Sequence, residues 1–189
     1  MIFVRTIPGK LGIRASDTAE IALDGVRVPK TNLVGKRGAG FYQLMHFFDT
    51  TRVFVAAQGV GLAQACLDES VKYCKERTAF GMPLGAYQLS MKKLAEMWIQ
   101  IEALRNMTYK GALSLDSKKP DYHISAMAKF FAGQTAVFCA NAAVELHGGY
   151  GYIDEYKVQK WYRDAKILEL YEGTKEAEIM TLGRVLMSK

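Results

Sequence analysis

Cysteine is scarce in this 189-residue chain, and the few cysteines present form no recognisable pattern. Cys66, Cys74 and Cys139 lack the paired spacing of a zinc site, and an odd number does not suit a disulfide framework. We therefore expect three reduced, buried thiols and no metal site.

The sequence also lacks long apolar runs. No stretch approaches the roughly 20 consecutive apolar residues that cross a bilayer. No signal-peptide pattern precedes the first strand-like residues, Ile2, Phe3 and Val4. From these absences we expect no membrane insertion and a cytoplasmic protein.

Lysine and arginine exceed the acidic residues, giving a formal net charge of +6, but they form no basic tail and no patch interleaved with aromatics. This scatter argues against a nucleic-acid partner. The charge suits a phosphate-rich ligand such as a dinucleotide or coenzyme A equally well. Internal repeats and low-complexity segments are absent too. Half of the residues are hydrophobic, which is enough to form an ordinary core.

The N-terminal part of the chain has strand patterns. Residues 19–23 alternate, Asp24 and Gly25 form a turn signal, and residues 26–28 return before Pro29. This pattern predicts a hairpin between 19–23 and 26–28. Because a lone hairpin cannot bury its apolar face, we interpret residues 1–36 as the incomplete end of a β domain.

The remainder, residues 37–189, changes to helical periodicity. Apolar residues at helical spacing predict long helices over 41–74 and 88–116 and a third that stops at Gly148 and Gly149, then shorter ones over 156–166 and 175–187. We expect Gly59 and Gly61 to permit close helix contact within the first helix. The predicted fold is mainly α, an antiparallel four-helix-type bundle preceded by a small β remnant.

The motif Y-E-G-T at 171–174 precedes the last predicted helix. A Glu beside a flexible Gly can place a carboxylate in a cleft while nearby backbone N–H groups stay free, an arrangement suited to proton abstraction next to a carbonyl. Alternatively, Glu172 is a first-turn acid favoured by the helix dipole, with Gly173 and Thr174 forming the cap. These residues alone favour the second explanation.

Four segments in this order resemble the acyl-CoA dehydrogenase family: Y-C-K-E-R-T-A-F-G-M-P-L (73–84) with Gln88, E-L-H-G-G-Y-G-Y (145–152), Y-R-D-A-K (162–166) and Y-E-G-T (171–174). Residues 12–29 also resemble the end of that family's middle β domain. The resemblance covers nearly the whole chain. It implies that an N-terminal helical domain and most of the β domain are missing here.

The resemblance implies α,β-dehydrogenation of an acyl-CoA thioester, with Glu172 as the base that removes the α-proton and FAD receiving the β-hydrogen as hydride. The Glu172 N–H and a ribityl hydroxyl of FAD would hold the thioester oxygen, and Tyr171 and Gly173 would shape the acyl entrance. Some branches of the family carry the base on the first helix at the position of Thr51, which leaves Glu172 as the one candidate. Two further positions, Asp49 and Arg52, match the acyl-CoA channel, although without the family they would be an i,i+3 ion pair on a solvated helix face.

By the same resemblance, FAD-binding residues are Arg77, Phe80, Gln88, Glu145, Gly148, Gly149, Thr174 and Glu176. The first three would clamp the FAD of a neighbouring subunit, which implies a homodimer or homotetramer. If the family resemblance is set aside, the segment of Arg77 and Phe80 is a helix–helix loop with an exposed Arg and a core Phe. The glycines at 148 and 149 are then only a helix stop. The chain departs from the family's usual residues at Ala79, where a hydroxyl is common, and at Glu145 and Glu176, where amides occur.

We expect an electron-transfer flavoprotein as the acceptor. Because half of the contacts to the flavin ring would be missing, we expect this polypeptide alone to bind FAD weakly and to be inactive. Other interpretations stay open: a non-catalytic helical oligomerisation module, an acyl-CoA oxidase, or a DNA-associated flavoprotein of similar fold. The length and branching of the acyl group are not determined by the sequence.

Overall fold

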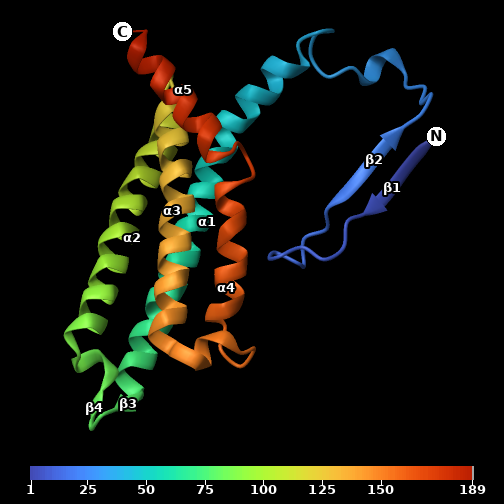
Figure 1. Ribbon diagram of the computed structural model, residues 1–189. Coiled ribbons are helices and arrows are strands. Elements are labelled where there is room, and N and C mark those ends of the chain that lie inside the picture. Colours follow the sequence, from blue (N-terminus) through green and yellow to red (C-terminus); the bar gives the residue numbers. More distant parts are fainter. Residues whose placement is uncertain (189) are drawn as a thin grey trace.

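The computed structural model describes residues 1–188 and confirms a mainly helical chain preceded by a small sheet (Figure 1). Helices α1 (Gly40–Glu76), α2 (Gln88–Leu115), α3 (Tyr122–His147) and α4 (Val158–Ala165) run alternately in opposite directions. The last helix, α5 (Lys175–Met187), leaves from one end of this bundle. The predicted antiparallel bundle is therefore present, with α4 much shorter than the other three.

Short connections force this alternation, because a helix can only turn back beside its predecessor when the loop is short. Between α1 and α2 lie a two-residue ladder, β3 (Thr78–Ala79) with β4 (Met82–Pro83), and the 3-10 turn η2 (Leu84–Ala86). The turns η3 (Gly148–Tyr152) and η4 (Lys166–Glu169) flank α4. A further 3-10 turn, η1, spans Lys30–Asn32.

Helix α3 lies at the centre of the bundle and contacts α1, α2 and α4. Its start is capped by Asp121, whose carboxylate accepts a hydrogen bond from the His123 N–H at 3.0 Å. Its end is set by Gly148, which has a φ of 59°. Both signals match the start and stop expected from the sequence.

Alanine and glycine residues at the contact let α1 and α3 approach closely. A Cβ built on Gly59 would lie 2.8 Å from the Ala132 Cβ, so no larger residue fits without movement. At Gly61 the same construction meets nothing within 4 Å. The expectation of close packing therefore holds for Gly59 and is wrong for Gly61.

The predicted hairpin between residues 19–23 and 26–28 is wrong. Strand β2 (Ala19–Leu23) instead pairs antiparallel with β1 (Ile2–Thr6), with Ile2 opposite Leu23. The physical reason is the length of the available partner: β1 offers five residues, whereas 26–28 is cut short by Pro29, which has no N–H to donate. The side chains of this ladder are almost all exposed, so it buries no apolar face within the chain.

The N-terminal arm is attached to the bundle through its loop. The Ile13 N–H donates to Asp164 Oδ1 at 2.7 Å, and the Arg163 guanidinium donates to the Leu11 carbonyl at 3.4 Å. A Cβ on Gly12 would lie 2.4 Å from the Arg163 carbonyl oxygen, so glycine permits this close docking on α4.

The three cysteines are free and buried, as expected. Burial raises the pKa of Cys139 to about 12, so this thiol stays protonated near neutral pH. Within residues 1–188, no helix is both long and apolar enough to cross a membrane.

Candidate functional site

The residues expected to carry function gather at two separate ends of the bundle. The Glu172 end contains Asp49, Arg52, Tyr171, Glu172, Gly173, Thr174 and Glu176. The Arg77 end contains Arg77, Phe80, Gln88, Glu145, Gly148 and Gly149. Thr51 contacts Glu172, and the stretch of α1 from Thr51 to Arg77 spans about 39 Å at 1.5 Å per residue.

Glu172 lies on a tight turn between η4 and α5. Its φ is 57°, a left-handed conformation that costs a non-glycine residue about 1 kcal/mol, and Gly173 follows with a φ of 100°. The half-buried Glu172 side chain returns to α1, where its Oε2 accepts a hydrogen bond from Thr51 Oγ1 at 2.5 Å. Its N–H has no hydrogen-bond acceptor among the described residues.

Helix α5 begins after this turn, at Lys175. The Thr174 side chain caps it by accepting from the Ala177 N–H at 3.3 Å, and Glu176 is an exposed residue of the first helical turn. Glu172 precedes the cap, so the alternative that made Glu172 a first-turn acid is wrong. The capping role expected in that alternative does hold for Thr174.

Asp49 and Arg52 form the expected i,i+3 pair, with Arg52 Nη1 2.7 Å from Asp49 Oδ1. The pair is not on a solvated face, since the Arg52 side chain is only 15% exposed. The Arg52 Nε also lies 3.7 Å from Glu178 Oε1. Arg52 therefore joins Asp49 to a charge inside the bundle.

Sequence reasoning missed two buried charges behind Glu172. Lys129 on α3 and Glu178 on α5 have side chains that are 1% and 0% exposed, and Lys129 Nζ lies 3.6 Å from Glu178 Oε1. Burial raises the pKa of Glu178 to about 7 and lowers the pKa of Lys129, while each charge partly offsets the other's shift. The available signal was a lysine among the apolar residues of α3, a position where an unpaired charge is costly.

Tyr171 lies beside an apolar cavity of about 420 Å³. The loop of the N-terminal arm forms one wall, and Ile167 and Leu170 form another. The Tyr171 hydroxyl donates to the Gln58 side chain on α1, which fixes the ring at the edge of this cavity. The surroundings suit an apolar chain better than a charged group.

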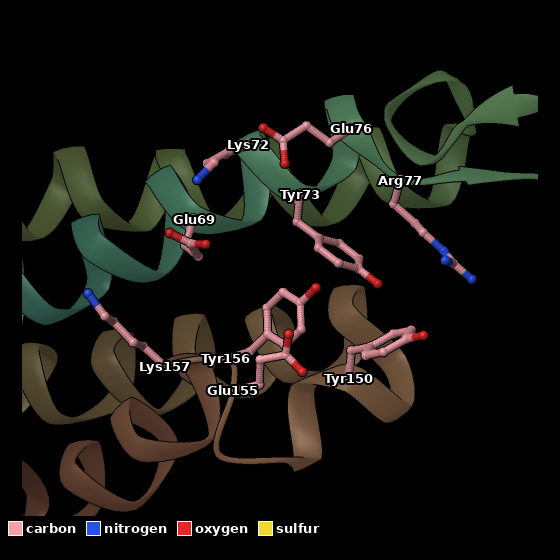
Figure 2. Close-up of a pocket in the computed structure, with 9 residues that line it drawn as sticks. All are labelled: Glu69, Lys72, Tyr73, Glu76, Arg77, Tyr150, Glu155, Tyr156 and Lys157. Carbon is pink, nitrogen blue, oxygen red and sulfur yellow. The ribbon is translucent and has the colours of Figure 1, made fainter.

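At the Arg77 end, a cavity of about 710 Å³ is lined by three tyrosines and by both basic and acidic side chains, the acidic ones being Glu69, Glu76 and Glu155 (Figure 2). Figure 2 shows Tyr73 reaching from α1 toward Tyr150 and Tyr156 on the facing segment. The Arg77 guanidinium carbon lies 5.6 Å from the centre of the Tyr150 ring, within range of a cation–π contact. Gly148 and Gly149 line an adjoining cavity of about 580 Å³ that Arg77 shares.

Phe80 and Gln88 line a third cavity, of about 600 Å³. Phe80 sits in the β3–β4 turn with a φ of 50° and is 98% exposed. The alternative that placed Phe80 in the core is therefore wrong. The ring is presented outward, where a bound molecule or another copy of the chain can cover it.

Glu145 is not an isolated negative charge at this end. Its carboxylate pairs with Lys93 of α2 and accepts a hydrogen bond from Asn141 at 2.9 Å. These two contacts hold the pKa of Glu145 below its usual range, so the group stays ionised while Lys93 neutralises it. Lys93 was not anticipated from the sequence, because the pair joins residues 52 positions apart.

These groups fit a dinucleotide such as FAD. A guanidinium and an amide are suitable donors to pyrophosphate and to polar ring atoms, and an exposed aromatic ring can pack on the cofactor. A Cβ built on Gly148 or Gly149 meets nothing within 4 Å, so the backbone there is open to a ligand.

Comparison with known proteins gives concordant results. Residues 38–187 match the family model of the acyl-CoA dehydrogenase C-terminal domain. The chain is 43% identical to the mitochondrial short-chain specific acyl-CoA dehydrogenase of Mus musculus over 180 residues, which cover 95% of this chain and 44% of the relative.

Solved structures agree with this result. The butyryl-CoA dehydrogenase of Megasphaera elsdenii superposes with a TM-score of 0.95 at 41% identity, covering 98% of this chain and 49% of that one. A structure described as the electron transferring flavoprotein of Acidaminococcus fermentans superposes with a TM-score of 0.97 at 38% identity. The match covers 100% of this chain and 50% of that one. The chain thus spans about half the length of the relatives it matches.

Proposed function

Because the chain belongs to the acyl-CoA dehydrogenase family, we propose that the whole protein oxidises an acyl-CoA thioester to its α,β-unsaturated product with FAD as cofactor. The observation that carries this proposal is the Glu172 carboxylate, which a left-handed turn presents toward Thr51 at the edge of the bundle. A carboxylate held in this way is a suitable base for a proton next to a thioester carbonyl.

In this proposal Glu172 takes the α-proton onto its carboxylate. Its own N–H, which is free of other acceptors in residues 1–188, donates to the thioester oxygen as negative charge develops there. One well-placed donor of this kind contributes about 3–4 kcal/mol to transition-state stabilisation. FAD supplies the hydride acceptor, which no amino-acid side chain can provide.

The two ends of the bundle serve different FAD molecules in this proposal. Thr51, which contacts Glu172, is separated from Arg77 by about 39 Å of helix, too far for Glu172 and Arg77 to contact the same reacting atoms. A second copy of the chain would bring its Arg77 end to the Glu172 end of the first, in a homodimer or homotetramer. Exposed apolar side chains on α2, among them Trp98, Ile99 and Leu113, support such association.

The electron acceptor and the location are parts of the same proposal. We infer that an electron-transfer flavoprotein receives the electrons and that the protein works in the cytoplasm. The acceptor is tested by mixing the reduced enzyme with candidate flavoproteins and following reoxidation. Rapid reoxidation by oxygen alone would favour an acyl-CoA oxidase instead.

The direct test of the proposed function is a panel of acyl-CoA thioesters added to the intact flavoprotein while flavin absorbance is followed. Bleaching by at least one thioester supports dehydrogenation and identifies the acyl length. No bleaching across the panel would favour the non-catalytic oligomerisation module. For the 189-residue chain alone, we expect little bound FAD and no turnover, and a stoichiometric yellow chromophore in purified material would contradict this.

A further inference from the structure

Lys129 reaches the turn that carries Glu172 from inside the bundle. Its ammonium group donates a hydrogen bond to the Gly173 carbonyl, 44 residues away in the sequence. Only 1% of the side chain is exposed. A lysine buried this far is costly unless its charge is matched and its donors are used.

Glu178 provides the matching charge. Its Oε1 lies 3.6 Å from Lys129 Nζ and 3.7 Å from Arg52 Nε, and neither carboxylate oxygen accepts a hydrogen bond among residues 1–188. The contact is thus mainly electrostatic. Lys129 keeps its donors for the turn, while Glu178 keeps the ammonium group charged and in place.

The turn needs such a support. Glu172 and Gly173 both have positive φ values, and glycine is the residue with the most alternative conformations open to it. A fixed donor at the Gly173 carbonyl removes those alternatives. Lys129 makes no hydrogen bond or ion pair with the Glu172 carboxylate, although the two charges attract each other through space. Its one direct contact with the turn is the hydrogen bond to the Gly173 carbonyl.

We propose that Lys129 is a positioning residue for the reaction: anchored by Glu178, it holds the Gly173 carbonyl and so keeps the turn in the conformation that directs Glu172 at Thr51. The kinetic part of this inference rests on the proposed function. The structural part does not, because the conformation of the turn can be measured without turnover.

The test compares K129M with the double variant K129M/E178Q. K129M removes the donor and leaves a buried carboxylate without its lysine, so it lowers both stability and rate. The double variant also removes that carboxylate, so stability should recover. We expect kcat for flavin reduction in the complete enzyme to fall about a hundredfold in both variants, with KM changed much less, because misplacement by about 1 Å has this effect.

The matched control is Ala140→Gly, a destabilising change in the same helix that touches no part of the turn. Its kcat should stay close to the unmodified enzyme's. Recovery of kcat in the double variant would overturn the proposal, since Lys129 would then serve only to neutralise Glu178.

A crystal structure of the double variant of the complete enzyme separates the two proposals. We expect Glu172 to lose its positive φ or its contact with Thr51. An unchanged turn would overturn the role of Lys129 whether or not the enzyme is active. If the unmodified flavoprotein is inactive on every acyl-CoA but the turn moves in the variant, the proposed function fails and the structural inference stands.

Discussion

Thr51 on α1 donates a 2.5 Å hydrogen bond to the carboxylate of Glu172, 121 residues further along the chain. This bond joins the start of the bundle to the turn before α5. The family resemblance points to these two positions as alternative places for a base, and the structure puts them in hydrogen-bond contact. We expect the threonine to orient the carboxylate, since its hydroxyl donates to Glu172 Oε2.

Thr51→Val should slow flavin reduction by acyl-CoA about tenfold or more in the complete enzyme, because the carboxylate loses the hydrogen bond that holds its orientation. The measurement is stopped-flow absorbance of the flavin. Thr50→Val is the matched control, since the Thr50 hydroxyl bonds to the His46 carbonyl and not to Glu172. Equal rates in both variants would show that Thr51 does not orient the base.

Gly59→Ala and Gly61→Ala should change stability in opposite directions. The first places a Cβ 2.8 Å from Ala132 and should lower the free energy of unfolding by about 1–3 kcal/mol. The second meets open space and should raise it by about 0.5–1 kcal/mol through helix propensity. Urea denaturation measures both, and a loss at Gly61 equal to that at Gly59 would contradict the packing described here.

Glu178 should make the stability of the chain depend on pH. Burial raises its pKa from 4.5 to about 7, so the folded state binds this proton more tightly than the unfolded state does. The stabilisation is full below pH 4.5 and is lost as the pH rises through 7. Relative to E178Q, unfolding free energy should fall by about 2 kcal/mol between pH 5 and pH 8.

This comparison removes the titration of Glu178 and cancels the contributions of groups away from it. Burial lowers the pKa of His147, so the contribution of this residue to the free energy of unfolding rises with pH in the same range. That contribution is the same in both proteins. Asp49, Arg52 and Glu172 are also common to both. Lys129 loses its charge partner in E178Q, so burial lowers the pKa of this lysine further in the variant. Parallel pH profiles for the two proteins would show that Glu178 does not titrate in this window.

Arg77→Gln should reduce the FAD content of the complete enzyme, with a dissociation constant raised about tenfold or more, since charge-assisted bonds to pyrophosphate would be lost. Arg77→Lys should restore little, because an ammonium group cannot form the paired contact of a guanidinium. Flavin titration measures both. Lys75→Gln, an exposed change in the last turn of α1, serves as the control, and an equal loss there would indicate a general charge effect.

Much of the bundle could be predicted from local patterns. Apolar periodicity gave the long helices, the bounds of α5 agree with the prediction, and Gly148 ends α3 as expected. The family resemblance, carried by four short motifs, is confirmed by the comparisons. Each of these signals is carried by residues close together in the sequence, and helix propensity and capping act over that same short range.

Contacts between distant residues were not predictable in the same way. The predicted partner of β2, residues 26–28, was wrong. The strand that pairs with β2 instead is β1, which lies earlier in the chain. The Lys129–Glu178 pair and the Lys93–Glu145 pair each join two helices, and no local pattern specifies which residues meet. The roles of the individual site residues stay predictions.

The most direct test of the central claim is Glu172→Gln in the complete flavoprotein. Gln retains the size of the side chain and a hydrogen-bond acceptor for Thr51 but cannot take up the α-proton. We predict unchanged FAD content and no bleaching of the flavin by an acyl-CoA that bleaches the unmodified enzyme. Bleaching at an undiminished rate would show that another group is the base.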